Sequence, residues 1–176
     1  CEGLSAKSVR FIHRVLGAED ETNDRKDLTL TDLGVNAPIN LISCLRSLKF
    51  HSLGFEFQQN NPTLIADILE FVSGRKGLKK LQLVFLFEEL DDESISKLYN
   101  QLQSVISSPT LSQSVENLEF QACKMPSLFS TTLKLAATRI HQGHFNSLQT
   151  FNNTPIWQYA RPKFRFYHLG SKLLQE

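Results

Sequence analysis

The sequence predicts an α/β fold in which strand-plus-helix units repeat along a solenoid. Four hexapeptides share the spacing apolar-x-x-apolar, and their central residues are Leu48, Leu81, Leu118 and Leu148. The separations of 81 − 48 = 33, 118 − 81 = 37 and 148 − 118 = 30 residues give a period near 30. Amphipathic helix patterns lie between the hexapeptides. One strand and one helix cannot enclose their apolar faces alone, so stacked units would bury these leucines against each other.

The composition is typical of one globular domain, because 41% of the 176 residues are hydrophobic and 21% are charged. The sequence has no run of about 18 apolar residues, so we expect no membrane span. Three cysteines without metal-ligand or redox spacing favour a reducing compartment, and therefore a cytoplasmic or nuclear location. We expect no cofactor. Because the chain begins at Cys1 rather than Met, we expect it to belong to a larger chain or complex.

The charge is divided unevenly along the chain. Up to Asn117 there are twelve basic and sixteen acidic residues, a net charge of 12 − 16 = −4. From Leu118 onward there are seven basic and two acidic residues, a net charge of 7 − 2 = +5. In a solenoid, the order of units in sequence is also their order in space, so this pattern predicts an acidic end and a basic end.

Residues 1–27 are expected to form a helix and an acidic loop. Apolar residues recur at helical spacing in the stretch 5–16, and the stretch 19–27 is polar throughout. Repeating units then occupy residues 28–156. They begin with a short strand at 28–30 and a short helix after Pro38, and the first clear repeat strand is predicted at about 47–51.

Three longer helices are predicted between the repeat strands, each with its own start signal. Asn61-Pro62 precedes an apolar stripe that ends before Gly74. Asp91 and the two acidic residues after it precede a second stripe, which runs until Pro109. Ser127 is the cap candidate of the third helix, for which Gly143 supplies a stop.

On these residues the chain resembles the leucine-rich repeat family, whose unit reads L-x-x-L-x-L-x-x-N/C-x-L. In the third unit Val115, Leu118 and Phe120 stand at leucine positions, and Cys123 stands where the family has Asn or Cys. Asn153 takes that place in the fourth unit, whereas the first two units have leucines there. The unit length is similar to that of the intracellular kind, ribonuclease-inhibitor-like or F-box-associated.

The resemblance implies parallel strands on the concave face of an arc and helices on its convex face. It also implies a protein-binding role for the concave face. The side chains between the buried leucines would point into that face. The residues that we predict there are Lys49, His51, Lys80, Gln82, Val84, Glu119, Gln121, Gln149 and Phe151.

Residues 157–176 interleave aromatic and basic side chains and are predicted to form a cap on the open end of the solenoid. The residues that carry this pattern are Trp157, Tyr159, Arg161, Lys163, Phe164, Arg165 and Tyr167. The same pattern suits stacking on bases between phosphate contacts, so nucleic-acid binding is the alternative. A protein partner docking on this aromatic edge is a third interpretation.

The sequence offers weak signals for catalysis or metal binding. His141 and His144 would share a helix face, but Gly143 interrupts the helix and no acidic residue or cysteine is near. Cys123 is explained by its repeat position, and no nucleophile elbow or phosphate loop occurs. We therefore predict a non-enzymatic protein-interaction module, an adaptor or a subunit of a larger assembly. Substrate recognition in a ubiquitin ligase is a narrower version suggested by the resemblance alone.

Overall fold

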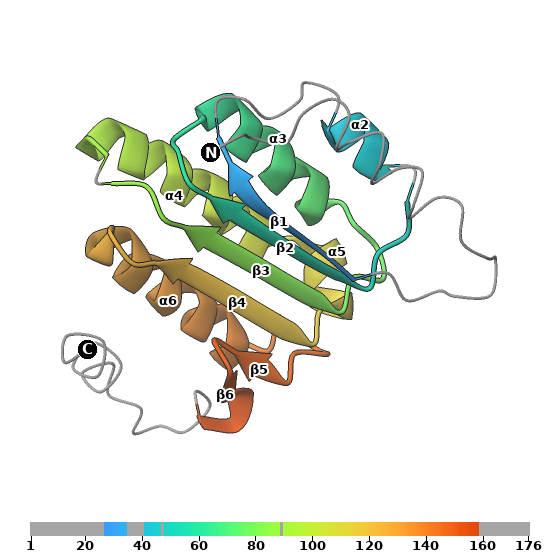
Figure 1. Ribbon diagram of the computed structural model, residues 1–176. Coiled ribbons are helices and arrows are strands. Elements are labelled where there is room, and N and C mark those ends of the chain that lie inside the picture. Colours follow the sequence, from blue (N-terminus) through green and yellow to red (C-terminus); the bar gives the residue numbers. More distant parts are fainter. Residues whose placement is uncertain (1–26, 35–40, 47, 89, 159–176) are drawn as a thin grey trace.

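The computed structural model describes residues 27–34, 41–46, 48–88 and 90–158. These residues form an open α/β structure around one six-stranded sheet, as Figure 1 shows. The strands follow each other across the sheet in sequence order, and they are β1 (Asp27–Leu33), β2 (Ser52–Phe57), β3 (Lys80–Phe85), β4 (Asn117–Ala122), β5 (Thr150–Phe151) and β6 (Thr154–Pro155). The first five strands are parallel, and β6 pairs antiparallel with β5.

The longer helices form one layer against the sheet. The helices in the described residues are α2 (Leu41–Arg46), α3 (Pro62–Ser73), α4 (Asp92–Ile106), α5 (Pro109–Ser114), α6 (Pro126–His141) and the 3₁₀-helix η1 (Ile156–Gln158). Helix α3 contacts α2 and α4, and α4 contacts α6, so the layer also follows sequence order (Figure 1). Strand–helix–strand connections are nearly always right-handed, so crossovers that advance in one direction place their helices on the same face.

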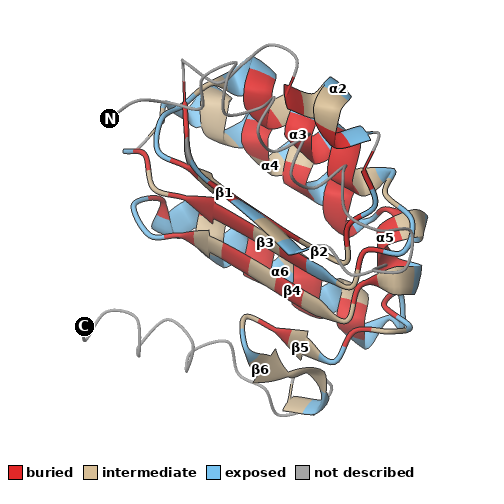
Figure 2. Cartoon of the chain, turned by 45° about the vertical axis from the view of Figure 1, so that its right-hand side comes forward, coloured by how far each residue is buried: buried red, intermediate tan, exposed pale blue. Residues whose placement is uncertain are grey.

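The core lies between the helix layer and the face of the sheet that it covers. Leu53, Leu81, Leu118 and Phe151 are paired across four neighbouring strands and are all buried. Two residues further along β2, β3 and β4, the buried residues Phe55, Leu83 and Phe120 are again paired across the sheet. At the ends of β2 and β3, the rings of Phe57 and Phe85 stack with their centroids 4.9 Å apart. The buried parts of the strands and of α3 and α4 are red in Figure 2.

Successive units are joined by the same backbone contact. His51, Lys79 and Glu116 directly precede β2, β3 and β4. The backbone carbonyl of each accepts hydrogen bonds from two consecutive N–H groups of the next unit, at 2.7–3.1 Å. These equivalent bonds fix the register of the units. The residues that share the position of Leu81 are therefore Leu28, Leu53, Leu118 and Phe151.

This register corrects the prediction for two strands. The predicted strand at 47–51 is wrong, because the strand is Ser52–Phe57 and Leu53, not Leu48, pairs with Leu81. Likewise Phe151, not Leu148, pairs with Leu118. Leu48 and Leu148 are buried in the segments that lead into the strands. The apolar-x-x-apolar spacing occurs in two overlapping phases there, and only pairing with the neighbouring strand distinguishes them.

The helix signals were correct at two of three starts. The side chain of Asn61 accepts a hydrogen bond from the N–H of Leu64 at 3.1 Å, and that of Asp91 accepts one from Ser94 at 2.9 Å. Ser127 is not the cap of α6, because that helix already begins at Pro126. Pro109 both follows α4 and opens α5, a short helix that the apolar pattern did not predict.

The predicted helix at 5–16, the acidic loop before Asp27 and the predicted cap after Gln158 lie outside the described residues.

Candidate interaction face of the sheet

The face of the sheet that points away from the helix layer, here called the open face, is the candidate site. Polar residues dominate its strand positions, in contrast to the apolar residues of the opposite face. Its residues are Asp27, Thr29, Ser52, Gly54, Glu56, Lys80, Gln82, Val84, Asn117, Glu119, Gln121 and Thr150. Most of them are half-buried or exposed, and none of the described helices covers them (Figures 1 and 2).

Gly54 lies near the centre of the open face and is buried. Side chains from the strands on either side close over this glycine. A Cβ built on Gly54 would lie 2.9 Å from Thr29 Oγ1 and 3.2 Å from Gln82 Oε1. On the next strand Val84 is only 8% exposed. Gly54 and Val84 are therefore buried positions among the polar side chains of the open face.

Two carboxylates of the open face, those of Glu56 in β2 and Glu119 in β4, each accept a hydrogen bond from a glutamine two residues further along the chain. Gln58 Nε2 donates to Glu56 Oε1 at 2.7 Å, and Gln121 Nε2 donates to Glu119 Oε1 at 2.6 Å. A carboxylate accepts up to about four hydrogen bonds, so both retain acceptor capacity for a further partner. Both carboxylate residues are half-buried.

At the edge of the open face, polar pairs link neighbouring units. Thr150 Oγ1 donates to Asn117 Oδ1 at 2.7 Å. Lys79 Nζ lies 2.6 Å from Glu116 Oε1, and about one third of each of these two side chains is exposed (36% and 32%). These contacts fix the polar side chains at the start of β3, β4 and β5.

The structure places four of the predicted concave-face residues on the open face with half-buried or exposed side chains: Lys80, Gln82, Glu119 and Gln121. Val84 lies there too, but its side chain is buried. Their role in binding remains a prediction.

The other four predicted residues are elsewhere. Lys49 and His51 precede β2, Gln149 precedes β5, and Phe151 is fully buried in the core. The reason is the register error described above, because a shift by an odd number of residues exchanges the two faces of a strand.

Sequence reasoning missed Glu56 and Gly54 for the same reason. The signal was present, because Phe50, Leu53 and Phe55 also fit the family spacing and the alternation continues to Phe57.

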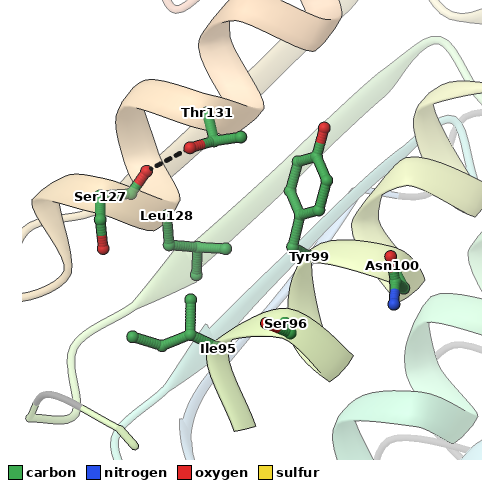
Figure 3. A pocket seen from close by; sticks show the side chains of 7 residues that line it. All are labelled: Ile95, Ser96, Tyr99, Asn100, Ser127, Leu128 and Thr131. Carbon is green, nitrogen blue, oxygen red and sulfur yellow. Dashed lines mark hydrogen bonds between the residues drawn. The ribbon is translucent and has the colours of Figure 1, made fainter. Parts of the chain in front are cut away.

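A hollow lies between α4 and α6 on the helix side. It is an open groove of about 280 Å³, lined by Ile95, Ser96, Tyr99, Asn100, Ser127, Leu128 and Thr131. Figure 3 shows Ile95 and Tyr99 projecting from α4 and Leu128 from α6. The hydroxyl of Thr131 is engaged with the backbone oxygen of Ser127 at 2.7 Å (Figure 3). The groove offers apolar contact but no charged group.

The remaining sequence candidates lie apart from the open face. His144 Nε2 is 3.2 Å from Arg139, an interaction at the end of α6. Cys123 is exposed after β4. In the described ranges no group of three or more His, Cys, Asp and Glu residues could hold a metal ion.

Trp157, in η1, is 54% exposed. The other residues of the predicted basic-aromatic edge, from Tyr159 to Tyr167, are outside the described part of the chain.

Comparison with protein-family models, with curated proteins and with solved structures finds no match. Within the described part of the chain, the helices are too short or too polar to cross a membrane.

Proposed function

We propose that this protein is a non-enzymatic interaction module of the leucine-rich-repeat type, an adaptor or a subunit of a larger assembly, that binds a protein partner on its open face. In this proposal the open face is the concave side of an arc and the helices form its convex side. Substrate recognition in a ubiquitin ligase is a narrower version that rests on the family resemblance alone. The partner is expected in the cytoplasm or the nucleus.

The observation that carries the proposal is the difference between the two faces of the sheet. One face is closed by helices and contains the core, whereas the other presents rows of polar side chains without a covering helix among the described residues. Rigid strands hold these side chains in fixed positions. The Glu–Gln hydrogen bonds reduce the entropy that these side chains would lose on binding.

Capture of a partner by matched variants tests the proposal. The face variant combines Lys80→Glu with Gln121→Arg, at two positions on the open face. The control combines Lys134→Glu with Gln103→Arg, at exposed positions on α6 and α4. Both variants change the net charge equally. We expect the face variant to lose a protein partner that the wild-type chain and the control both capture from nuclease-treated extract.

Equal capture by the face variant and the control would overturn the proposal. Capture that disappears with nuclease would favour the nucleic-acid alternative. Circular dichroism and a thermal melt of both variants would show that lost capture does not reflect unfolding.

A further inference from the structure

The open face carries a net negative charge. Its strand positions hold three acidic residues, Asp27, Glu56 and Glu119, and one basic residue, Lys80, so the charge is 1 − 3 = −2. None of the ion pairs among the described residues involves Glu56 or Glu119. Both carboxylates can therefore accept a cationic group of a partner.

Glu56 and Glu119 are oriented by neutral groups. Gln58 donates to Glu56 at 2.7 Å, and Gln121 donates to Glu119 at 2.6 Å. An amide donor orients a carboxylate without cancelling its charge, whereas the cation of a salt bridge does both. Both glutamates are also half-buried, so solvent and salt screen their charges less than those of fully exposed residues. The open face therefore presents two charged acceptors in fixed orientations.

The register of the sheet sets the separation of these two acceptors. Strand β3 lies between β2 and β4, and Glu56 is level with Gln121, two residues beyond Glu119. With strands about 4.8 Å apart and a rise of about 3.3 Å per residue, the two glutamate Cα atoms are roughly 12 Å apart. In an extended segment, side chains four residues apart lie on the same side, about 13 Å from each other. Two cations at that spacing can reach both carboxylates.

We propose that the partner of the open face is an extended protein segment with two basic side chains, four residues apart, which contact Glu56 and Glu119. Arginine fits these contacts best, because its planar group donates several hydrogen bonds and each carboxylate retains acceptor capacity. Nucleic acid does not fit this face, because a net negative charge repels phosphates. The inference rests on the proposed function, since it treats the open face as the binding surface.

NMR titration of the ¹⁵N-labelled full chain at low ionic strength tests the proposal. The probe is the peptide acetyl-Thr-Arg-Thr-Thr-Thr-Arg-Thr-amide. One control peptide has glutamate in place of both arginines, and the other has its arginines three residues apart, on opposite sides of an extended chain. We expect the probe to shift the side-chain amide signals of Gln58 and Gln121, which donate to the two carboxylates. The glutamate peptide should not bind, and the respaced peptide should bind more weakly.

Two variants of the chain supply the comparison. Glu56→Gln with Glu119→Gln removes both charges but keeps an oxygen that can accept from the neighbouring glutamine. Affinity for the probe should fall at least about fivefold, because two charge contacts are lost. Asp67→Asn with Glu70→Gln removes two exposed carboxylates of α3 and should leave the affinity unchanged. Equal binding to the two variants, equal binding of both arginine peptides, or no shift of signals from the open face would overturn the proposal.

The result is separable from the test of the proposed function. In the capture experiment, Gln121→Arg alone should abolish capture, because an arginine there pairs with Glu119 and repels a cationic partner, whereas Lys80→Glu alone should not. If Lys80→Glu alone abolishes capture and the probe does not bind, the inference fails and the interaction face stands. If the probe binds at Glu56 and Glu119 but capture does not depend on the face, the proposed function fails and the cation-binding site stands.

Discussion

The side chain of Asn152 binds the backbone of the neighbouring strand: its Oδ1 accepts a hydrogen bond from the N–H of Phe120 at 2.7 Å. Asn152 and Asn153 form the two-residue turn between β5 and β6, and their φ angles are 46° and 58°. Asparagine tolerates this left-handed conformation better than most residues. Among the described residues, Asn152 thus stands where the parallel pairing ends, and its side chain joins β4 to the turn after β5.

We expect Asn152→Ala to lower the free energy of unfolding by about 2 kcal/mol or more, because the N–H of Phe120 loses its partner and alanine is strained at positive φ. Asn152→Asp keeps an acceptor oxygen at the same position, so its loss should be smaller. Urea unfolding followed by circular dichroism measures both. The interpretation would be wrong if the alanine variant were as stable as the aspartate variant.

The turn also differs from the prediction made for it. The motif placed the turn-supporting asparagine at residue 153, and the structure gives that hydrogen bond to its neighbour Asn152. The backbone reverses at this turn instead of entering another helix, because Asn152 and Asn153 support a hairpin. The motif alone does not distinguish a final unit from an internal one.

More generally, the sequence predicted those elements that depend on local chemistry. Asn61 and Asp91 cap helices through their own side chains, and the parallel strands β3 and β4 carry a single unambiguous apolar phase. The register of β2 and β5 depends on contacts with residues far along the chain. For that reason Glu56 was missed and Phe151 was assigned to the wrong face.

A buried hydroxyl in α6 predicts a stabilising substitution. Thr132 is fully buried, and its Oγ1 has no hydrogen-bond partner in the described part of the structure. Thr132→Val replaces the hydroxyl with a methyl group of similar size, so we expect a gain of about 1–2 kcal/mol in the free energy of unfolding. The denaturation midpoint should rise without a change in the slope of the unfolding curve.

Thr138→Val is the matched control on the same helix. Thr138 is exposed and its Oγ1 already donates to Lys134 O at 2.8 Å. It should therefore gain no comparable stability. The assignment of a buried, unpaired hydroxyl would be contradicted if Thr138→Val raised the free energy of unfolding and Thr132→Val left it unchanged.

Arg75 links the first two described units on the helix side. Its guanidinium carbon lies 5.7 Å from the ring centroid of Phe50 and 5.2 Å from that of Phe71, and the side chain donates to Arg46 O at 3.3 Å. Partial burial lowers the pKa of Arg75, because desolvation disfavours its charged form. The faces of the two aromatic rings attract the guanidinium cation and so offset part of this desolvation penalty.

We therefore expect Arg75→Ala to destabilise the protein by about 1–2 kcal/mol. Arg75→Lys should restore only part of the loss, because lysine lacks the planar group that stacks on the rings. Lys76→Ala, at the exposed neighbouring position, should have little effect. Thermal melts would contradict this account if the Arg75→Ala and Lys76→Ala variants behaved alike.

The start of α4 should contribute to acid sensitivity. Asp91 accepts hydrogen bonds from Ser94 N and Ser94 Oγ, both at 2.9 Å, and these bonds lower the pKa of its carboxyl group. A folded-state pKa below the unfolded value stabilises the protein above the unfolded pKa, which is about 3.9. This contribution disappears as the pH falls through the folded-state pKa.

Asp91→Asn retains an oxygen that can cap the helix but does not titrate. We expect the wild type to lose more stability than this variant when the pH is lowered from neutral toward about 2. Ser94→Ala removes the bond from Oγ and keeps the backbone bond, so its loss on acidification should lie between the two. Urea unfolding across this pH range provides the measurement. Parallel stability curves for the wild type and Asp91→Asn would show that the helix cap does not contribute to the acid response.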